Sequence, residues 1–176
     1  MKRWLILLSV GCLAFAGAAN ASVQKGDTTL EALGGWLTEN AKETDGEDID
    51  VWFLTGAVGY FVTDNIQISG AVMWASLEMG TDDIDVWGIG GRAKYHFMPT
   101  NQWVPYAGGQ VMWASAEEGN DDVDGVLWGP VLGARYELNE TNDFFVEYQY
   151  HLWSGDIGDT IDDGHGLFLG IVHQFK

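Results

Sequence analysis

Cysteine, proline and basic residues are all scarce in this sequence. Its 176 residues include one cysteine, three prolines and eight lysines and arginines, against 26 acidic residues. One cysteine cannot form an internal disulfide or a thiolate zinc cluster. The deficit of basic residues leaves no positive face to neutralise phosphates, which argues against a nucleic-acid partner. The 24 glycines and 9 tryptophans, with so little proline, favour a fold of many short strands.

Residues 1–21 are predicted to be a cleaved signal peptide. Lys2 and Arg3 supply its positive charge, residues 4–15 are apolar, and residues 19–21 read Ala-Asn-Ala, which matches the cleavage pattern. The alternative, a lipoprotein acylated at Cys12, has a poor recognition sequence before the cysteine. Beyond this segment no apolar run approaches the roughly 18 to 20 residues of a spanning helix. The mature domain is therefore expected to comprise residues 22–176.

An internal repeat organises the rest of the chain. The motif VMWAS occurs at residues 72–76 and 111–115, and an acidic segment and a Gly-rich apolar stretch follow each copy. Each unit is typical of a hairpin. Apolar and polar residues that alternate with a period of two then predict eight strands, joined in turn by short turns and longer acidic loops. The strands are expected near residues 28–38, 50–62, 66–77, 84–97, 103–115, 126–138, 143–154 and 165–175.

Aromatic residues on the apolar face lie in two rows. Trp52 precedes Tyr60 by eight residues, and the same interval recurs on other strands. Eight tilted strand residues span roughly 20 Å along a barrel axis, close to the apolar band of about 25 Å on a transmembrane barrel. A soluble lipocalin-like barrel, the alternative, predicts no such pair of rows. The predicted girdles are Trp36, Trp52, Trp74, Trp87, Trp113 and Trp128 in one row and Tyr60, Tyr95, Tyr136 and Phe175 in the other.

These features together resemble a known family. The signal peptide, the alternating Gly-rich strands, the short turns and the last strand GLFLGIVHQF are similar to the small outer-membrane β-barrel proteins grouped with opacity-protein and porin-like surface antigens. The resemblance implies an all-β fold, an eight-stranded antiparallel up-and-down barrel in the outer membrane of a Gram-negative bacterium. It also implies a monomer inserted by the barrel-assembly machinery, with periplasmic termini and turns and extracellular acidic loops. The sequence departs from the family at its end, where Lys176 follows Phe175, and at Pro130, which we expect a local bulge to accommodate.

The inward face predicts how the barrel interior is filled. Eight strands enclose a space just wide enough for side chains, which disfavours an open aqueous pore. Buried charges must be paired, so the predicted inward residues are interpreted as a salt-bridged plug in a barrel with a structural or surface-interaction role. A path for protons or ions is the alternative. The predicted interior network is Glu31, Gln67, Arg92, Lys94, His96, Gln110, Arg135, Glu137, Glu147, Gln149 and His151.

The acidic loops suggest a second hypothesis. Clustered carboxylates are hard oxygen ligands for Ca²⁺ or Mg²⁺, which also bridge the phosphates of lipopolysaccharide. The alternative is a solvated, mutually repelling rim, and a cationic extracellular partner would be steered to the same surface. No other cofactor is expected. The candidate metal ligands are Asp82, Asp83, Asp85, Asp121, Asp122 and Asp124.

Two further functions remain as alternatives. A lipid A-modifying hydrolase would use His151 and Ser154, although a period of two places these side chains on opposite faces of one strand. A transporter could pass small hydrophobic molecules through a lateral opening in the wall. That reading rests on Pro130 and on the predicted lipid-facing glycines Gly34, Gly56, Gly70 and Gly109.

Overall fold

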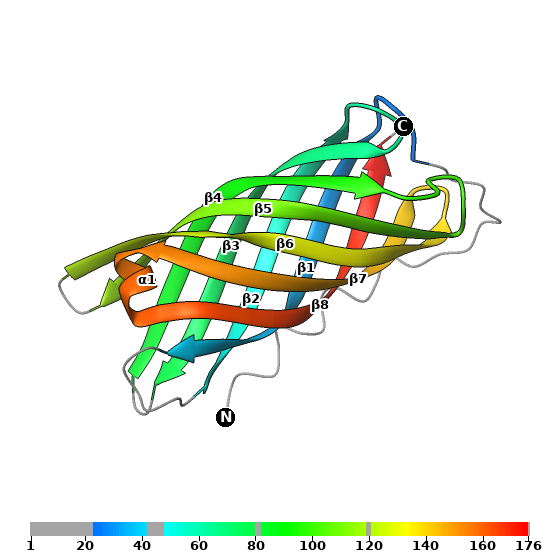
Figure 1. Cartoon of the computed structure of the whole chain (residues 1–176). Helices are drawn as coiled ribbons and strands as arrows, with labels where there is room; N and C mark the ends of the chain where they lie inside the picture. Colours follow the sequence, from blue (N-terminus) through cyan, green and yellow to red (C-terminus); the bar gives the residue numbers. More distant parts are fainter. Residues whose placement is uncertain (1–22, 42–47, 80–81, 119–120, 176) are drawn as a thin grey trace.

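The computed structural model describes residues 23–41, 48–79, 82–118 and 121–175, so the predicted signal peptide lies outside the described residues. The eight strands form one closed antiparallel barrel in chain order, which confirms the predicted fold class (Figure 1). β1 pairs with β2 on one side and with β8 on the other, and this last pairing closes the wall. The strands are β1 Thr28–Ala41, β2 Asp48–Phe61, β3 Ile66–Met79, β4 Asp82–His96, β5 Trp103–Glu118, β6 Asp121–Asn139, β7 Asn142–Gly155 and β8 Ile161–Phe175.

The two ends of the barrel differ. At the turn end, short connections join β2 to β3, β4 to β5 and β6 to β7. The first described residues also lie there, since the amide of Gly26 donates to the carbonyl of Phe61. The other end, the loop end, holds α1 (Asp156–Thr160) and is opposite the C-terminus (Figure 1). Among the described residues, no helix has the length and hydropathy to cross a membrane.

The strands reach further at the loop end than the sequence predicts. β6 begins at Asp121 rather than near 126, and only residues 80–81 separate β3 from β4. The backbones of Glu78 and Asp83 are paired, so acidic segments that we assigned to loops continue the strands. Hydrogen bonds between neighbouring strands satisfy the backbone in lipid and in water alike. The alternation of apolar and polar residues that identifies strands in the sequence, however, ends where the wall leaves the lipid. The five-residue α1 was likewise not predicted.

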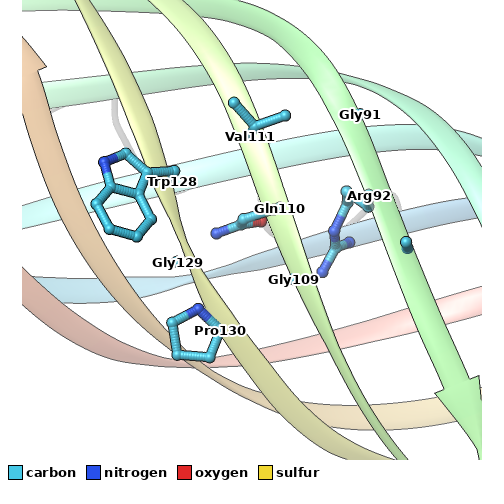
Figure 2. A pocket seen from close by; sticks show the side chains of 9 residues that line it. Gly91, Arg92, Gly109, Gln110, Val111, Trp128, Gly129 and Pro130 are labelled. Carbon is cyan, nitrogen blue, oxygen red and sulfur yellow. The ribbon is translucent and has the colours of Figure 1, made fainter.

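Pro130 interrupts the wall without the bulge that the sequence analysis expects. Pairs on both sides, Trp128 with Leu152 and Val131 with Gln149, keep one register across β6 and β7. The pairs that would include Gly129 and Pro130 are missing from this ladder, while Pro130 remains paired with β5. Because proline has no amide donor, the structure omits ladder contacts instead of inserting a residue. Figure 2 shows Pro130 beside Gly129 on the wall.

Alternation divides the side chains between two faces. The outer face is apolar, and it carries both predicted aromatic rows at its two levels. Trp52 and Phe175 are more than half exposed there, at 59% and 52%. Trp103, which our prediction omitted, joins the row at the turn end with its ring 4.8 Å from that of Tyr136.

The inner face changes character along the barrel axis. Toward the loop end it is an apolar half, in which α1 supplies Ile157 and β7 supplies Trp153 as the outermost layer. Toward the turn end it is a polar half that holds the buried charges. The apolar half includes Leu37, Val51, Phe53, Met73, Ala75, Val86, Met112, Ala114, Leu127 and Phe168. Our prediction of a polar interior therefore describes only one half of it.

Inward glycines allow neighbouring strands to approach closely. A Cβ atom at Gly129 would collide with the backbone carbonyl oxygen of Tyr150, and one at Gly90 with that of Val111. Backbone atoms cannot move aside as a flexible side chain can. Glycine at these positions is thus a requirement of the narrow, strongly twisted wall.

Candidate functional site

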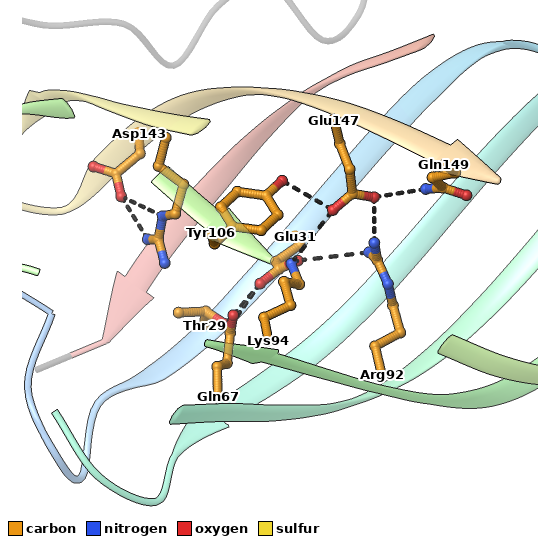
Figure 3. Close-up of polar contacts among 10 residues, drawn as sticks. Thr29, Glu31, Gln67, Arg92, Lys94, Tyr106, Asp143, Glu147 and Gln149 are labelled. Atoms are coloured by element: carbon orange, nitrogen blue, oxygen red, sulfur yellow. Dashed lines mark hydrogen bonds and ion pairs between the residues drawn. The ribbon is translucent and has the colours of Figure 1, made fainter. Parts of the chain in front are cut away.

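Four charged side chains meet at the centre of the polar half. Lys94 Nζ lies 2.6 Å from Glu31 Oε2, and Arg92 forms an ion pair with Glu147 (Figure 3). Longer contacts join the two pairs: Arg92 Nη1 is 3.9 Å from Glu31 Oε2, and Lys94 Nζ is 4.0 Å from Glu147 Oε2. The side chains are at most 3% exposed. Each charge therefore has opposite charges as its neighbours, which is the condition for burying ions stably.

Neutral donors complete the coordination of both carboxylates. Gln67 Nε2 donates to Glu31 Oε1 at 2.6 Å and to Thr29 Oγ1 at 2.7 Å. Tyr106 Oη donates to Glu147 Oε2 at 2.9 Å, and Gln149 Nε2 donates to Glu147 Oε1 at 2.6 Å. Together with Arg92 and Lys94 on β4, the residues of this network come from five strands. The network thus links opposite walls of the barrel.

A second cluster lies nearer the turn end. Asp143 Oδ2 accepts from Arg135 Nε at 3.0 Å and from Gln174 Nε2 at 2.9 Å. Figure 3 shows Asp143 apart from the central network. Sequence reasoning missed Asp143 and Gln174, although the same period of two places Asp143 on the face of Glu147. Both residues lie at strand ends, where the alternation of polarity is hardest to follow.

An aromatic layer adjoins both clusters. The ring of His96 is 5.1 Å from that of Phe61 and 5.3 Å from that of Tyr106. Arg135 lies over the Phe61 ring, 5.9 Å from its centroid, and Lys94 lies 5.1 Å from that of Tyr106. The rings thereby contact cations from both clusters, an arrangement that favours buried positive charge.

The third group connects the polar half to the apolar half. His151 Nε2 lies 2.8 Å from Gln149 Oε1 and 3.0 Å from Gln110 Nε2. Its ring is also 5.9 Å from that of Phe53, a member of the apolar half. His151 therefore stands at the boundary between the two halves. Glu137, the remaining member of the predicted network, is buried near the turn end at 7% exposure.

The hydrolase candidates are not brought together. Ser154 is exposed, and its Oγ donates to the carbonyl of Val126 at 3.3 Å. His151 is buried and points into the barrel. A nucleophile and its base must lie within hydrogen-bond reach. The two side chains point to opposite sides of the wall.

The predicted metal ligands fall mostly beyond the side chains that the structure describes. Asp85 and Asp124 are exposed, whereas the side chains of Asp82, Asp83, Asp121 and Asp122 lie outside the described set. Within the described residues, no group of three or more His, Cys, Asp or Glu side chains is arranged to hold a metal ion.

Comparison with known proteins agrees with this architecture. Residues 5–175 match the family described as outer membrane protein beta-barrel domain. Neisserial surface protein A is 18% identical, with a TM-score of 0.69 over 86% of this chain and 100% of that one. OprG from Pseudomonas aeruginosa is 16% identical, with a TM-score of 0.51 over 90% of this chain and 99% of that one. No curated protein sequence is a significant match.

A third similar structure is Ail, the attachment invasion locus protein of Yersinia pestis, in complex with the heparin analogue sucrose octasulfate. It is 13% identical, with a TM-score of 0.53 over 86% of this chain and 100% of that one. Identities this low show a shared fold.

Proposed function

Because this chain belongs to the outer membrane β-barrel family, we propose that it is a closed, non-conducting barrel with a structural or surface-interaction role in the cell envelope. The protein is integral to the bacterial outer membrane. It needs no resident cofactor for such a role, and a monomer is sufficient because the barrel leaves no open sheet edge.

The apolar half of the interior carries this proposal. A solute that entered at the loop end would meet Ile157 and then the side chains of Leu37, Phe53 and Leu127, which are at most 8% exposed. Beyond them lies the central charge network. An ion would lose its hydration in the first layer and would have to displace paired charges in the second, and both steps are costly. The two halves act as barriers in series, which also argues against the proton or ion path.

Orientation follows from the asymmetry of the two ends. We propose that the turn end and both termini are periplasmic and that the loop end faces the exterior. Such an orientation presents the acid-rich strand extensions to the surroundings. Divalent cations bound weakly by these carboxylates would bridge to lipopolysaccharide phosphates, and a cationic partner would be steered to the same end.

Conductance across a planar bilayer tests the closed barrel. The purified, refolded protein is expected to give no stable current steps at any applied voltage. Successful insertion must be shown in parallel by slower gel migration of the heated sample relative to the unheated one, which intact barrels give. Reproducible ohmic steps from the wild-type barrel would contradict the proposal.

The hydrolase alternative has a direct test. Lipid A extracted from cells that express the wild-type protein should have the same mass spectrum as lipid A from cells that express His151→Ala. The reason is geometric, since Ser154 and His151 lie on opposite faces of β7. Loss of an acyl chain with the wild type alone would establish enzymatic activity.

Lateral passage of small hydrophobic molecules is less well supported. The wall loses ladder contacts at Pro130, but the side chains behind it are tied together, because Gln110 Nε2 donates to Gln149 Oε1 at 2.9 Å. A hydrophobic molecule that entered here would have to break polar contacts and receive no polar replacement. We therefore interpret the outer side of this region as a surface feature.

A further inference from the structure

A groove lies on the outer face where β4, β5 and β6 run side by side. Its volume is about 540 Å³. Gly91 and Gly109 leave its base without side chains, and Val111, Trp128 and Pro130 stand around them (Figure 2). Val111 and Trp128 are 54% and 48% exposed. On a wall otherwise covered by apolar side chains, this is a depression of the size and polarity that an acyl chain fills.

The tryptophan row gives the depth of the groove in the membrane. Trp128 belongs to that row and also lines the groove, while Gly109 and Pro130 lie further toward the turn end. Tryptophan rows mark the boundary between hydrocarbon and headgroups. In the proposed orientation the groove therefore begins at the headgroup level of the outer leaflet and descends into its hydrocarbon.

The same row changes chemistry on the two strands that follow. β1 to β6 each contribute an outward tryptophan, but β7 and β8 contribute Tyr150 and His165, which are register partners. Tyr150 Oη donates to the carboxylate of Asp163, and the exposed Tyr148 ring lies 6.2 Å from that of His165. We call Tyr148, Tyr150, Asp163 and His165 the polar patch.

The groove and the polar patch are contiguous. Tyr150 lies opposite Pro130, between the pairs Trp128 with Leu152 and Val131 with Gln149. One molecule can therefore occupy the groove with an acyl chain and reach the polar patch with its headgroup. Tyr150 donates one hydrogen bond to the Asp163 carboxylate and so fixes its position at the headgroup level, where hydroxyl groups of a lipid can also donate to it.

We propose that this surface binds the sugar headgroup and one acyl chain of an outer-leaflet glycolipid. Sugar hydroxyls donate to the Asp163 carboxylate and accept from His165, while the apolar face of a sugar ring packs on Tyr148. A headgroup that carries only a phosphate would be repelled by Asp163. This binding surface lies on the outer face alone, so its test does not depend on whether the interior is closed.

Groove-filling variants test the acyl-chain part. At Gly91 and Gly109 a Cβ atom would lie 3.7 Å and 3.6 Å from the nearest backbone atom, so leucine fits there without disturbing the wall. Gly91→Leu and Gly109→Leu are the test variants. Gly56→Leu is the matched control, because Gly56 is outward on β2, has its nearest neighbour at 3.9 Å and does not line the groove.

Headgroup variants test the sugar part. Asp163→Asn removes the charge, Tyr150→Phe removes its donor, and His165→Gln replaces the exposed ring. Glu140→Gln is the control for charge, since Glu140 is exposed at the turn end. Each variant is first checked for the heat-dependent gel shift of an intact barrel. Because His165 is exposed, His165→Gln is expected to fold and still tests the site if a leucine variant does not fold.

Native mass spectrometry of the barrel in detergent measures binding. The probes are hexa-acylated lipid A and, for comparison, phosphatidylethanolamine, both in a buffer with Mg²⁺ to offset repulsion between the lipid A phosphates and the acidic barrel. One lipid A per barrel is expected, bound in preference to phosphatidylethanolamine. Both sets of variants should weaken the affinity for lipid A by about tenfold, which is the effect expected from losing a charge-assisted hydrogen bond or a packed acyl chain.

The other outcomes overturn the proposal. Equal binding by wild type and all variants would mean that the lipid binds elsewhere or without a site. Equal affinity for phosphatidylethanolamine would show that the sugar is not recognised. Weakening in only one of the two sets would separate the groove from the polar patch and refute a single site.

Discussion

The two halves of the barrel interior are filled by different chemistry. In the apolar half, side chains such as Leu127 pack with no exposure, as they would in a soluble core. In the polar half, Glu31, Lys94, Arg92 and Glu147 form a closed set of opposite charges. Removing atoms from a packed apolar core lowers stability roughly in proportion to the volume removed. Removing one member of a buried charge network leaves another charge without its partner, which is costly in itself. The halves should therefore respond differently to equivalent truncations.

The largest effect is expected from Glu147→Leu. The substitution leaves the Arg92 guanidinium and the Tyr106 hydroxyl without their acceptor in a buried site. The free energy of unfolding should fall by about 4 kcal/mol, as measured by urea denaturation in lipid vesicles. The double variant Arg92→Met with Glu147→Leu should recover much of this loss, because no unpaired charge remains. A loss below about 1 kcal/mol in the single variant would show that the network is hydrated and weak.

A somewhat smaller effect is expected in the apolar half. Leu127→Ala removes a fully buried side chain and should lower the free energy of unfolding by about 3 kcal/mol. Leu132→Ala is the matched control on the same strand, since Leu132 is 55% exposed on the outer face. Because that face contacts lipid rather than protein, the control should lose less. Equal losses would mean that the apolar half is not packed as a core.

The smallest effect separates a buried hydroxyl from an exposed one. Tyr106→Phe removes one donor to Glu147 and should cost about 2 kcal/mol in the same denaturation assay. Tyr136 accepts a hydrogen bond from Gln102 at an exposed position, so Tyr136→Phe should change stability by no more than about 0.5 kcal/mol. Similar values for the two would indicate that water replaces the Tyr106 hydroxyl inside the barrel.

The inward residues of the interior network could be predicted from the sequence, but their partners could not. Alternation places Arg92, Lys94 and Glu147 on the inward face, and the structure has them there. It says nothing about which strand faces which across the interior, so the pairing of Glu31 on β1 with Lys94 on β4 was not predictable. Asp143 followed the same alternation and was overlooked only because it lies at a strand end.

The apolar half escaped prediction for a different reason. Where both faces of a strand are apolar, the alternation of polarity vanishes, so inward residues such as Phe53 and Met73 cannot be told from the membrane-facing wall by sequence. Alternation along β7 places Trp153 on the inward face with His151, but its contact with the apolar core depends on the fold of β7 and α1 around it. Likewise, the loop-end acids seemed to belong to loops until the strand register showed Glu117 paired with Asp122.

For this protein, the sequence alone determines the number of strands, the faces of a strand wherever apolar and polar residues alternate, and the two aromatic rows. These properties depend on local periodicity and on the solvent that each face meets. The tertiary structure decides everything that requires a second strand: the partners of buried charges, the division of the interior into halves and the junction between the groove and the polar patch. Such contacts join residues far apart in the chain, and only the register of the closed barrel brings them together.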